Sequence, residues 1–246
     1  MEKVKVGAVS YLNTKPLIYG FESGMMSDEI DLKIDYPARI ADELIRGTID
    51  VGLVPVAILP ELKQPEIIST YGITCDGKVA TVCLFSQVSV DEITHVYLDY
   101  QSRTSVALLK ILFKEYWKKS PVLLPATPGF EQKISGTTAA LVIGDRAFPL
   151  HQQTAFVYDL GEIWKQHTGL PFVFAAWIAN KQLTDDFKAR FDEANALGIL
   201  KLDEVIQQHP YPHYDLKIYY TSNIKFKPES PMAPVISLFL EKLKAL

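Results

Sequence analysis

The sequence is poor in cysteine, in long apolar runs and in excess positive charge, and each shortage excludes a class of protein. Cys75 and Cys83 are its two cysteines, and their spacing fits neither a redox pair nor a zinc site. No run of about 18 apolar residues occurs, so no transmembrane helix is expected. The formal net charge is −4 and the basic residues are spread along the chain, which argues against a nucleic-acid surface.

Familiar catalytic motifs are missing as well. The sequence contains no Gly-rich phosphate loop, no paired-carboxylate motif and no nucleophile elbow. His209 and His213 are four residues apart, but Pro210 and Pro212 predict a loop there and not a metal site. The start of the chain lacks a hydrophobic signal core, and cysteine is scarce, so we expect a cytoplasmic protein.

The composition is that of an ordinary globular protein, and the sequence patterns predict alternating strands and helices. The chain has 246 residues, of which 48% are hydrophobic and 22% charged, enough for a sizeable core and long enough for two lobes. Strand patterns at 4–9, 32–36 and 49–54 are separated by helix patterns, one of which, 38–46, lies between Pro37 and Gly47. This order predicts an α/β fold with a parallel sheet.

A second α/β unit follows, and then a mostly helical tail. The elements expected after residue 86 and before the tail are strands at 95–98, 122–124, 139–143, 156–158 and 172–178, and helices at 104–117 and 160–167. Residues 214–220 suit a strand or a helix. If the tail packs back on the first unit, the chain passes between the two lobes twice, once near Ser86 and once near Ala175. We therefore expect lobe I to comprise residues 1–85 and 175–246 and lobe II residues 86–174, with a ligand cleft between them.

Two clusters of polar residues lie where strands give way to helices. Ser10-Tyr11-Leu12-Asn13 follows the first strand and could present the Asn13 amide to a ligand, or simply cap a helix. Ser102-Arg103-Thr104-Ser105 opens the helix that runs to residue 117. Its hydroxyls and free backbone N–H groups predict an anion site, since they exceed what a cap requires.

Two further strand ends are weaker candidates. Gly144 would let the backbone approach a ligand closely, and Asp145 could act as a base, a hydroxyl acceptor or a helix cap paired with Arg146. Pro55 and Val56 end the third strand, where the backbone could face a ligand or the strand could simply stop. The residues alone thus indicate a two-lobed α/β protein that binds a small anion.

Five segments together resemble the chorismate dehydratase family of the futalosine route to menaquinone. They are Ser10 to Leu17 (SYLNTKPL), Asp50 to Val56 (DVGLVPV), Ser102 to Ser105 (SRTS), Ile143 to Ala147 (IGDRA) and Trp164 to Trp177 (WKQHTGLPFVFAAW). The last is long and specific. The related 1,4-dihydroxy-6-naphthoate synthase family is associated with a different opening, of the type SPCPND, so the first segment favours the dehydratase.

The resemblance implies a fold like that of type II periplasmic binding proteins and the loss of water from chorismate to give 3-[(1-carboxyvinyl)oxy]benzoate. That reaction makes an aromatic ring, so the enzyme need only fix geometry, hold two carboxylates and help hydroxide to leave, without metal or organic cofactor. The implied partner is this small dicarboxylate, with neither nucleic acid nor membrane. A non-catalytic cytoplasmic anion-binding or sensor protein on the same fold is the alternative.

We expect the Ser102-to-Ser105 helix start to bind one carboxylate. Asn13 and Ser10 would contact the ring hydroxyl or the other carboxylate, and Ser86 at the first crossing is a further candidate donor. The base is either Asp145, the one carboxylate in these clusters, or a carboxylate of the substrate itself.

Overall fold

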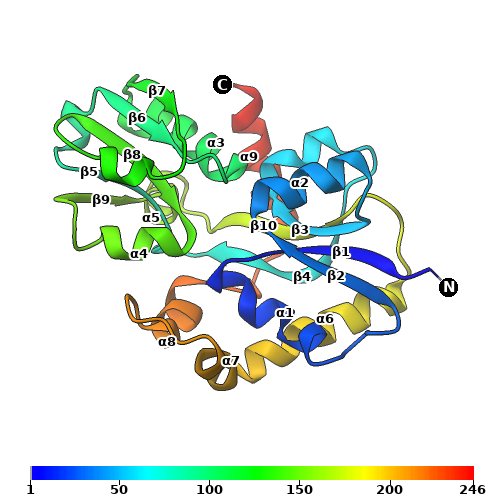
Figure 1. Ribbon diagram of the computed structural model, residues 1–246. Helices are drawn as coiled ribbons and strands as arrows, with labels where there is room; N and C mark the ends of the chain where they lie inside the picture. Colours follow the sequence, from blue (N-terminus) through cyan, green and yellow to red (C-terminus); the bar gives the residue numbers. More distant parts are fainter. Residues whose placement is uncertain (1) are drawn as a thin grey trace.

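The structure is a computed structural model that describes residues 2–246 and contains two five-stranded sheets (Figure 1). The first sheet has the order β2-β1-β3-β10-β4 and consists of β1 (Val4–Val9), β2 (Ile30–Asp35), β3 (Val51–Pro55), β4 (Glu66–Cys75) and β10 (Phe172–Ala179). The second has the order β7-β6-β8-β5-β9 and consists of β5 (Val82–Ser86), β6 (His95–Leu98), β7 (Val122–Pro125), β8 (Thr138–Ile143) and β9 (Phe156–Asp159). We call the first sheet with its helices lobe I and the second lobe II.

Helices connect and cover these strands. In lobe I and the C-terminal part they are η1 (Leu12–Thr14), α1 (Lys15–Glu22), α2 (Pro37–Arg46), η2 (Val56–Glu61), α6 (Asp185–Leu200), α7 (Leu202–Gln208), α8 (Leu216–Ile218), η7 (Tyr219–Asn223) and α9 (Met232–Lys244). In lobe II they are η3 (Val90–Glu92), α3 (Arg103–Leu112), η4 (Phe113–Trp117), η5 (Phe130–Lys133), η6 (Gly144–Arg146), α4 (Ala147–Leu150) and α5 (Leu160–Thr168). None of the helices described between residues 2 and 246 is long and apolar enough to span a membrane.

The predicted α/β fold is confirmed, and so is the parallel pairing at the start of the chain. Strand β1 pairs in parallel with β2 on one side and β3 on the other. Pro37 lies in the first turn of α2 and Gly47 ends it with φ +72°, a conformation that glycine adopts without steric cost. Strand β10 enters between β3 and β4 and runs antiparallel to both, so lobe I is a mixed sheet.

The two crossings between lobes lie earlier in the chain than we expected. Strand β5 pairs with β8 and β9, so residues 82–86 belong to lobe II and the first crossing is formed by residues 76–81 instead of lying near Ser86. Strand β10 pairs with lobe I from Phe172 onward, so the second crossing is 169–171 instead of near Ala175. Both strands are apolar and almost wholly buried, so their hydrophobic pattern does not reveal which sheet they join.

The C-terminal helices cover lobe I. Helices α1 and α6 pack against each other below the first sheet in Figure 1, and α2 lies above it. Helix α9 contacts β10 and also α3, so it bridges the two lobes. The ambiguous segment 214–220 is largely helical, since α8 and η7 follow each other there.

The close contact between α1 and α6 generates a stability prediction. A Cβ atom on Gly20 would lie 2.2 Å from the carbonyl oxygen of Ala194, so the two helices would have to separate. We expect Gly20→Ala to lower the free energy of unfolding by about 2 kcal/mol, although alanine has the better helix propensity. Denaturant unfolding measures the change. The exposed Ala189→Ser on α6 is the control, with a change of at most about 0.5 kcal/mol, and an equally small change for Gly20→Ala would contradict the prediction.

Candidate active site

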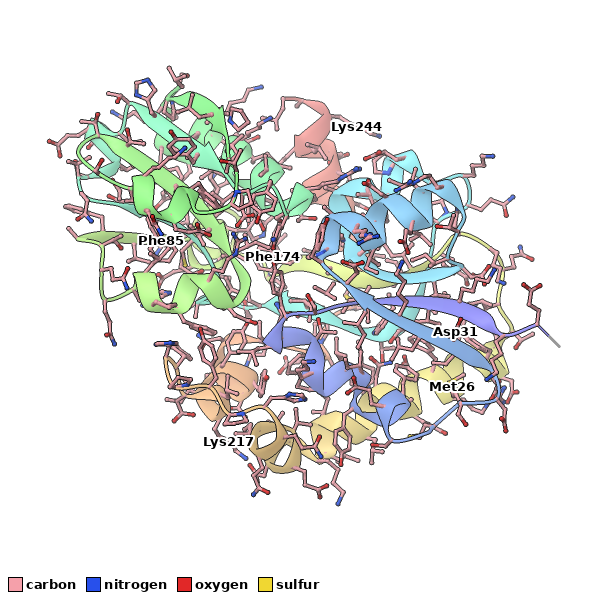
Figure 2. All side chains as sticks on the ribbon, in the orientation of Figure 1. Met26, Asp31, Phe85, Phe174, Lys217 and Lys244 are labelled. Atoms are coloured by element: carbon pink, nitrogen blue, oxygen red, sulfur yellow. The ribbon has the colours of Figure 1, made fainter. Side chains whose placement is uncertain are left out.

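A cavity lies between the two lobes and is lined by both. Its volume, counted as space for the centres of water molecules, is about 60 Å³, which is room for several waters. The polar side chains that line it are Tyr11, Asn13, Thr81, Ser102, Thr104 and Ser105. The remaining wall is Val9, Pro37, Pro55, Ile73, Val79, Val82, Ile143, Gly144, Phe174 and Ala175. Figure 2 labels Phe174 at the junction of the lobes.

The structure brings seven of the predicted site residues to this cavity and leaves five outside its lining. Those that line it are Tyr11, Asn13, Pro55, Ser102, Thr104, Ser105 and Gly144. Those that do not are Ser10, Val56, Ser86, Arg103 and Asp145. The predicted meeting of the first polar cluster with the start of the 104–117 helix is therefore observed, although the two are about 90 residues apart in sequence.

The start of α3 supplies hydroxyl groups to the cavity. Ser102 is the N-cap, and its Oγ accepts the Ser105 N–H at 3.1 Å. The Thr104 Oγ1 accepts the Ala57 N–H from lobe I at 3.1 Å. Because each hydroxyl uses a lone pair in these bonds, its own O–H is available to donate to a ligand. The positive end of the helix dipole points the same way, which favours an anion.

Asn13, Thr81 and Tyr219 form a second polar group, of which Asn13 and Thr81 line the cavity. The Thr81 Oγ1 lies 2.7 Å from the Tyr219 hydroxyl, and Asn13 is close enough to lower the pKa of that phenol. Burial nevertheless raises the Tyr219 pKa well above its usual value, so the phenol is neutral and keeps its proton for a hydrogen bond. The sequence analysis missed Thr81 because its neighbours Ala80 and Val82 are apolar and form no polar cluster with it. It missed Tyr219 because the structure of residues 214–220 was ambiguous.

Tyr11 closes one side of the cavity. Its hydroxyl donates to the Gln101 Oε1 of lobe II, and burial raises its pKa, which keeps the phenol neutral. The ring lies flat on Gly144, where a Cβ atom would be 2.9 Å from two ring carbons. Gly144 also has φ +67°. The backbone at Gly144 was predicted to approach a ligand closely; in the structure it is the Tyr11 ring, part of the cavity wall, that lies close to it.

Asp145 lies beside the cavity and ties the lobes together. Its two carboxylate oxygens accept the Leu12 N–H of lobe I at 3.1 and 3.2 Å. Burial raises the pKa of Asp145 to about 6, although the Leu12 N–H and the nearby Lys15 and Arg146 act in the opposite direction. The carboxylate is therefore partly protonated in mildly acidic solution, and a role for it as a base stays a prediction.

The other predicted residues outside the lining have structural partners. Arg103 points away from the cavity to Asp42 at 2.6 Å and Glu61 at 3.0 Å, two ion pairs that join the lobes at the surface. Ser10 is exposed and extends the pairing of β1 with β2.

Val56 and Ser86 are fully buried in their own lobes. The expectation that Ser86 lies at the crossing is wrong, because it ends β5 opposite Phe156, at the far end of the strand from the cavity-lining Val82. Its hydroxyl accepts the Val88 N–H.

Neutral donors characterise this cavity. Among residues 2–246, no lysine, arginine, histidine, aspartate or glutamate side chain lines it. Hydroxyls, an amide and a helix N-terminus can bind carboxylates, but they leave much of the negative charge uncompensated. The arrangement suits a small anion with an apolar body, held across two lobes.

Comparisons with known proteins agree with this geometry. The chain matches a family model described as menaquinone biosynthesis over residues 4–227. It is 30% identical to a chorismate dehydratase of Thermus thermophilus in an alignment of 239 residues that covers 84% of each chain.

Solved structures show the fold. A protein of Archaeoglobus fulgidus superposes with a TM-score of 0.72 at 16% identity, over 99% of this chain and 97% of that one. The periplasmic aliphatic sulphonate-binding protein of Escherichia coli gives a TM-score of 0.63 at 15% identity, over 100% and 86%. The two-lobed architecture is therefore that of periplasmic binding proteins. Together with the family match and the curated relative, it shows that this chain belongs to the chorismate dehydratase family of menaquinone biosynthesis.

Proposed function

We propose that this protein is a chorismate dehydratase, a carbon–oxygen lyase that converts chorismate to 3-[(1-carboxyvinyl)oxy]benzoate and water. The single observation that carries the proposal is the cavity between the lobes, which the hydroxyls of α3, Asn13 and Thr81 line together with apolar residues, in a chain of this family. The substrate is a small dicarboxylate with an apolar ring, which matches that distribution of donors. A biosynthetic enzyme of this kind acts in the cytoplasm.

The chemistry requires little of the protein. The proton on C3 passes to a base, the C4 hydroxyl leaves with its bonding pair and takes up a proton, and the ring becomes aromatic. Because aromatisation supplies the driving force, the protein has to orient the substrate and stabilise the leaving oxygen. The residues that line the cavity can do both without a metal or an organic cofactor.

One substrate carboxylate is placed at the start of α3 in this proposal. There the Ser102, Thr104 and Ser105 hydroxyls and the helix dipole act together on the anion. Asn13 and Thr81, which line the same cavity, then contact the C4 hydroxyl and help it to leave. Contacts from both lobes mean that the lobes close over the substrate and exclude water.

The base in this proposal is a carboxylate of the substrate. Asp145 does not line the cavity, and both of its oxygens are engaged by the Leu12 N–H. A substrate carboxylate beside apolar walls such as Val9, Ile73 and Phe174, with no cation to stabilise its charge, has a raised pKa and is a stronger base than in water.

A binding protein is the second candidate, because the structural neighbours include a protein that binds aliphatic sulphonates. Incubation with chorismate separates the two functions. An aromatic enol ether product supports the enzyme, and tight binding without product identifies a binding or sensor protein.

The Asn13 amide is the first group to test. We expect Asn13→Ala to lower kcat/KM for chorismate by about 100-fold, since it removes a donor aimed at the leaving hydroxyl. The rate of product formation measures the effect. Asn180→Ala, at the end of β10 where its amide oxygen accepts the Gln64 N–H, is the matched control and should stay within about twofold of the natural protein. Equal activities of both variants would contradict the role given to Asn13.

Replacement of Asp145 separates the two candidate bases. If a substrate carboxylate takes the proton, Asp145→Asn keeps kcat within about tenfold of the natural value, because asparagine can still accept the Leu12 N–H. Loss of an essential general base costs about 100-fold to 10,000-fold. Turnover at pH 7.5 decides, and a loss of that larger size would make Asp145 the base.

The raised pKa of Asp145 also predicts how stability depends on pH. The carboxyl titrates at about 6 in the folded protein and at 3.8 ordinarily, so its contribution to stability is complete below about pH 4 and is lost as the pH rises through 6. Asparagine does not titrate. Between pH 4 and 7 the free energy of unfolding of Asp145→Asn should therefore rise by about 2 kcal/mol relative to the natural protein, measured by urea unfolding. A difference that does not vary with pH would contradict the burial of this carboxyl.

A further inference from the structure

The first crossing between the lobes is held by a buried carboxylate from lobe II. Asp159 ends β9, caps α5 and is 6% exposed. Its Oδ1 accepts the N–H groups of Gly161 at 3.0 Å and Glu162 at 3.2 Å, which is the usual work of an N-cap. Its Oδ2 accepts the N–H groups of Val79 at 3.0 Å and Ala80 at 2.7 Å, residues that lie about 80 positions earlier in the chain.

Ala80 has an unusual backbone conformation at this point. Its φ is +64°, the left-handed region in which a Cβ atom is unfavourable. The residue is 5% exposed, and its carbonyl oxygen lies 2.7 Å from the His151 Nε2. A strained conformation of this kind persists only where its surroundings impose it, and Ala80 is bonded by Asp159 through its N–H and by His151 through its carbonyl.

The residues on either side of Ala80 face the cavity. Val79 and Thr81 both line it. The Thr81 Oγ1 lies 2.7 Å from the Tyr219 hydroxyl, and the Thr81 carbonyl accepts the Gly144 N–H at 2.9 Å. The direction of the chain at Ala80 therefore sets where the Thr81 hydroxyl points.

We propose that Asp159 is a positioning residue of the active site, which holds Ala80 in the left-handed conformation and so aims the Thr81 hydroxyl at the substrate. This inference rests on the proposed function. A cap for α5 would need only the bonds to Gly161 and Glu162, so the two bonds to the crossing are an additional use of the same carboxylate. Asp159 itself does not line the cavity and acts through Thr81.

The substitution Asp159→Ser separates the two uses. Serine is a good N-cap and preserves the start of α5, but its hydroxyl is too short to reach the crossing as well. With a negative φ open to it, Ala80 then relaxes and Thr81 leaves its position. We expect kcat for chorismate to fall tenfold or more while KM changes less than threefold, because the binding groups of α3 are untouched.

A second background tests whether backbone conformation is the cause. Glycine adopts a positive φ without steric penalty, so Ala80→Gly lets the crossing keep its shape without the carboxylate. Asp159→Ser should then lower kcat by threefold or less relative to Ala80→Gly alone. Thr184→Ala, which removes the N-cap of α6, is the control for general destabilisation and should lower the thermal midpoint without changing kcat.

Two kinetic outcomes would overturn the inference. One is a kcat for Asp159→Ser within twofold of the natural protein. The other is a loss of kcat on Asp159→Ser that is equally large in the natural protein and in the Ala80→Gly variant.

A crystal structure of Asp159→Ser tests, without reference to activity, whether Asp159 holds Ala80 in the left-handed conformation. The expected result is a negative φ at Ala80 and a Thr81 hydroxyl that no longer contacts Tyr219. A retained positive φ would overturn the inference even if the enzyme turns over chorismate. Failure of the natural protein to turn over chorismate would instead overturn the proposed function, and the crystal structure would still decide the role of Asp159.

Discussion

Strand β10 is the element on which the arrangement of the two lobes depends. It enters the first sheet between β3 and β4, antiparallel to both, directly after the second crossing. The first sheet is therefore complete only after the chain has built lobe II and returned. The same strand carries Phe174 and Ala175 in the cavity wall, so the element that joins the lobes also forms part of the site.

The hydrogen-bond donors that line the cavity are uncharged, which affects how tightly a carboxylate would bind there and how basic it would remain. A cationic side chain would bind a carboxylate more tightly but would also lower its pKa and its basicity. In the proposed function, hydroxyls and a helix N-terminus would hold the anion and leave it reactive. The charged residues near the site serve another purpose, since Arg103, Asp42 and Glu61 join the lobes at the surface and Asp145 joins them beside the cavity. The neutral residues that line the cavity and the charged residues that join the lobes are thus different groups of residues.

Much of this could be predicted from the sequence. The α/β class and most strands and helices follow from hydrophobic periodicity, and the start of α3 at Ser102 follows from capping chemistry, which are local properties. The first polar cluster and the start of α3 were also expected to contact the same substrate, because the family resemblance implies that both lie in one cleft between the lobes. The family was recognisable from five short segments.

The tertiary structure alone decided where the lobes divide and which polar residues face the cavity. Residues 82–86 and 172–178 are buried on both faces of their strands, and such a pattern does not predict which sheet a strand joins. For that reason Ser86 was expected at the crossing. Thr81 and Tyr219 are 138 positions apart, and only the folded chain brings their hydroxyls together. The double use of the Asp159 carboxylate is equally invisible in sequence, since its cap of α5 is local but its bonds to Val79 and Ala80 join residues about 80 positions apart, which meet only once β9 has paired with β5. Local chemistry fixes the elements, and long-range packing decides which of their side chains share a site.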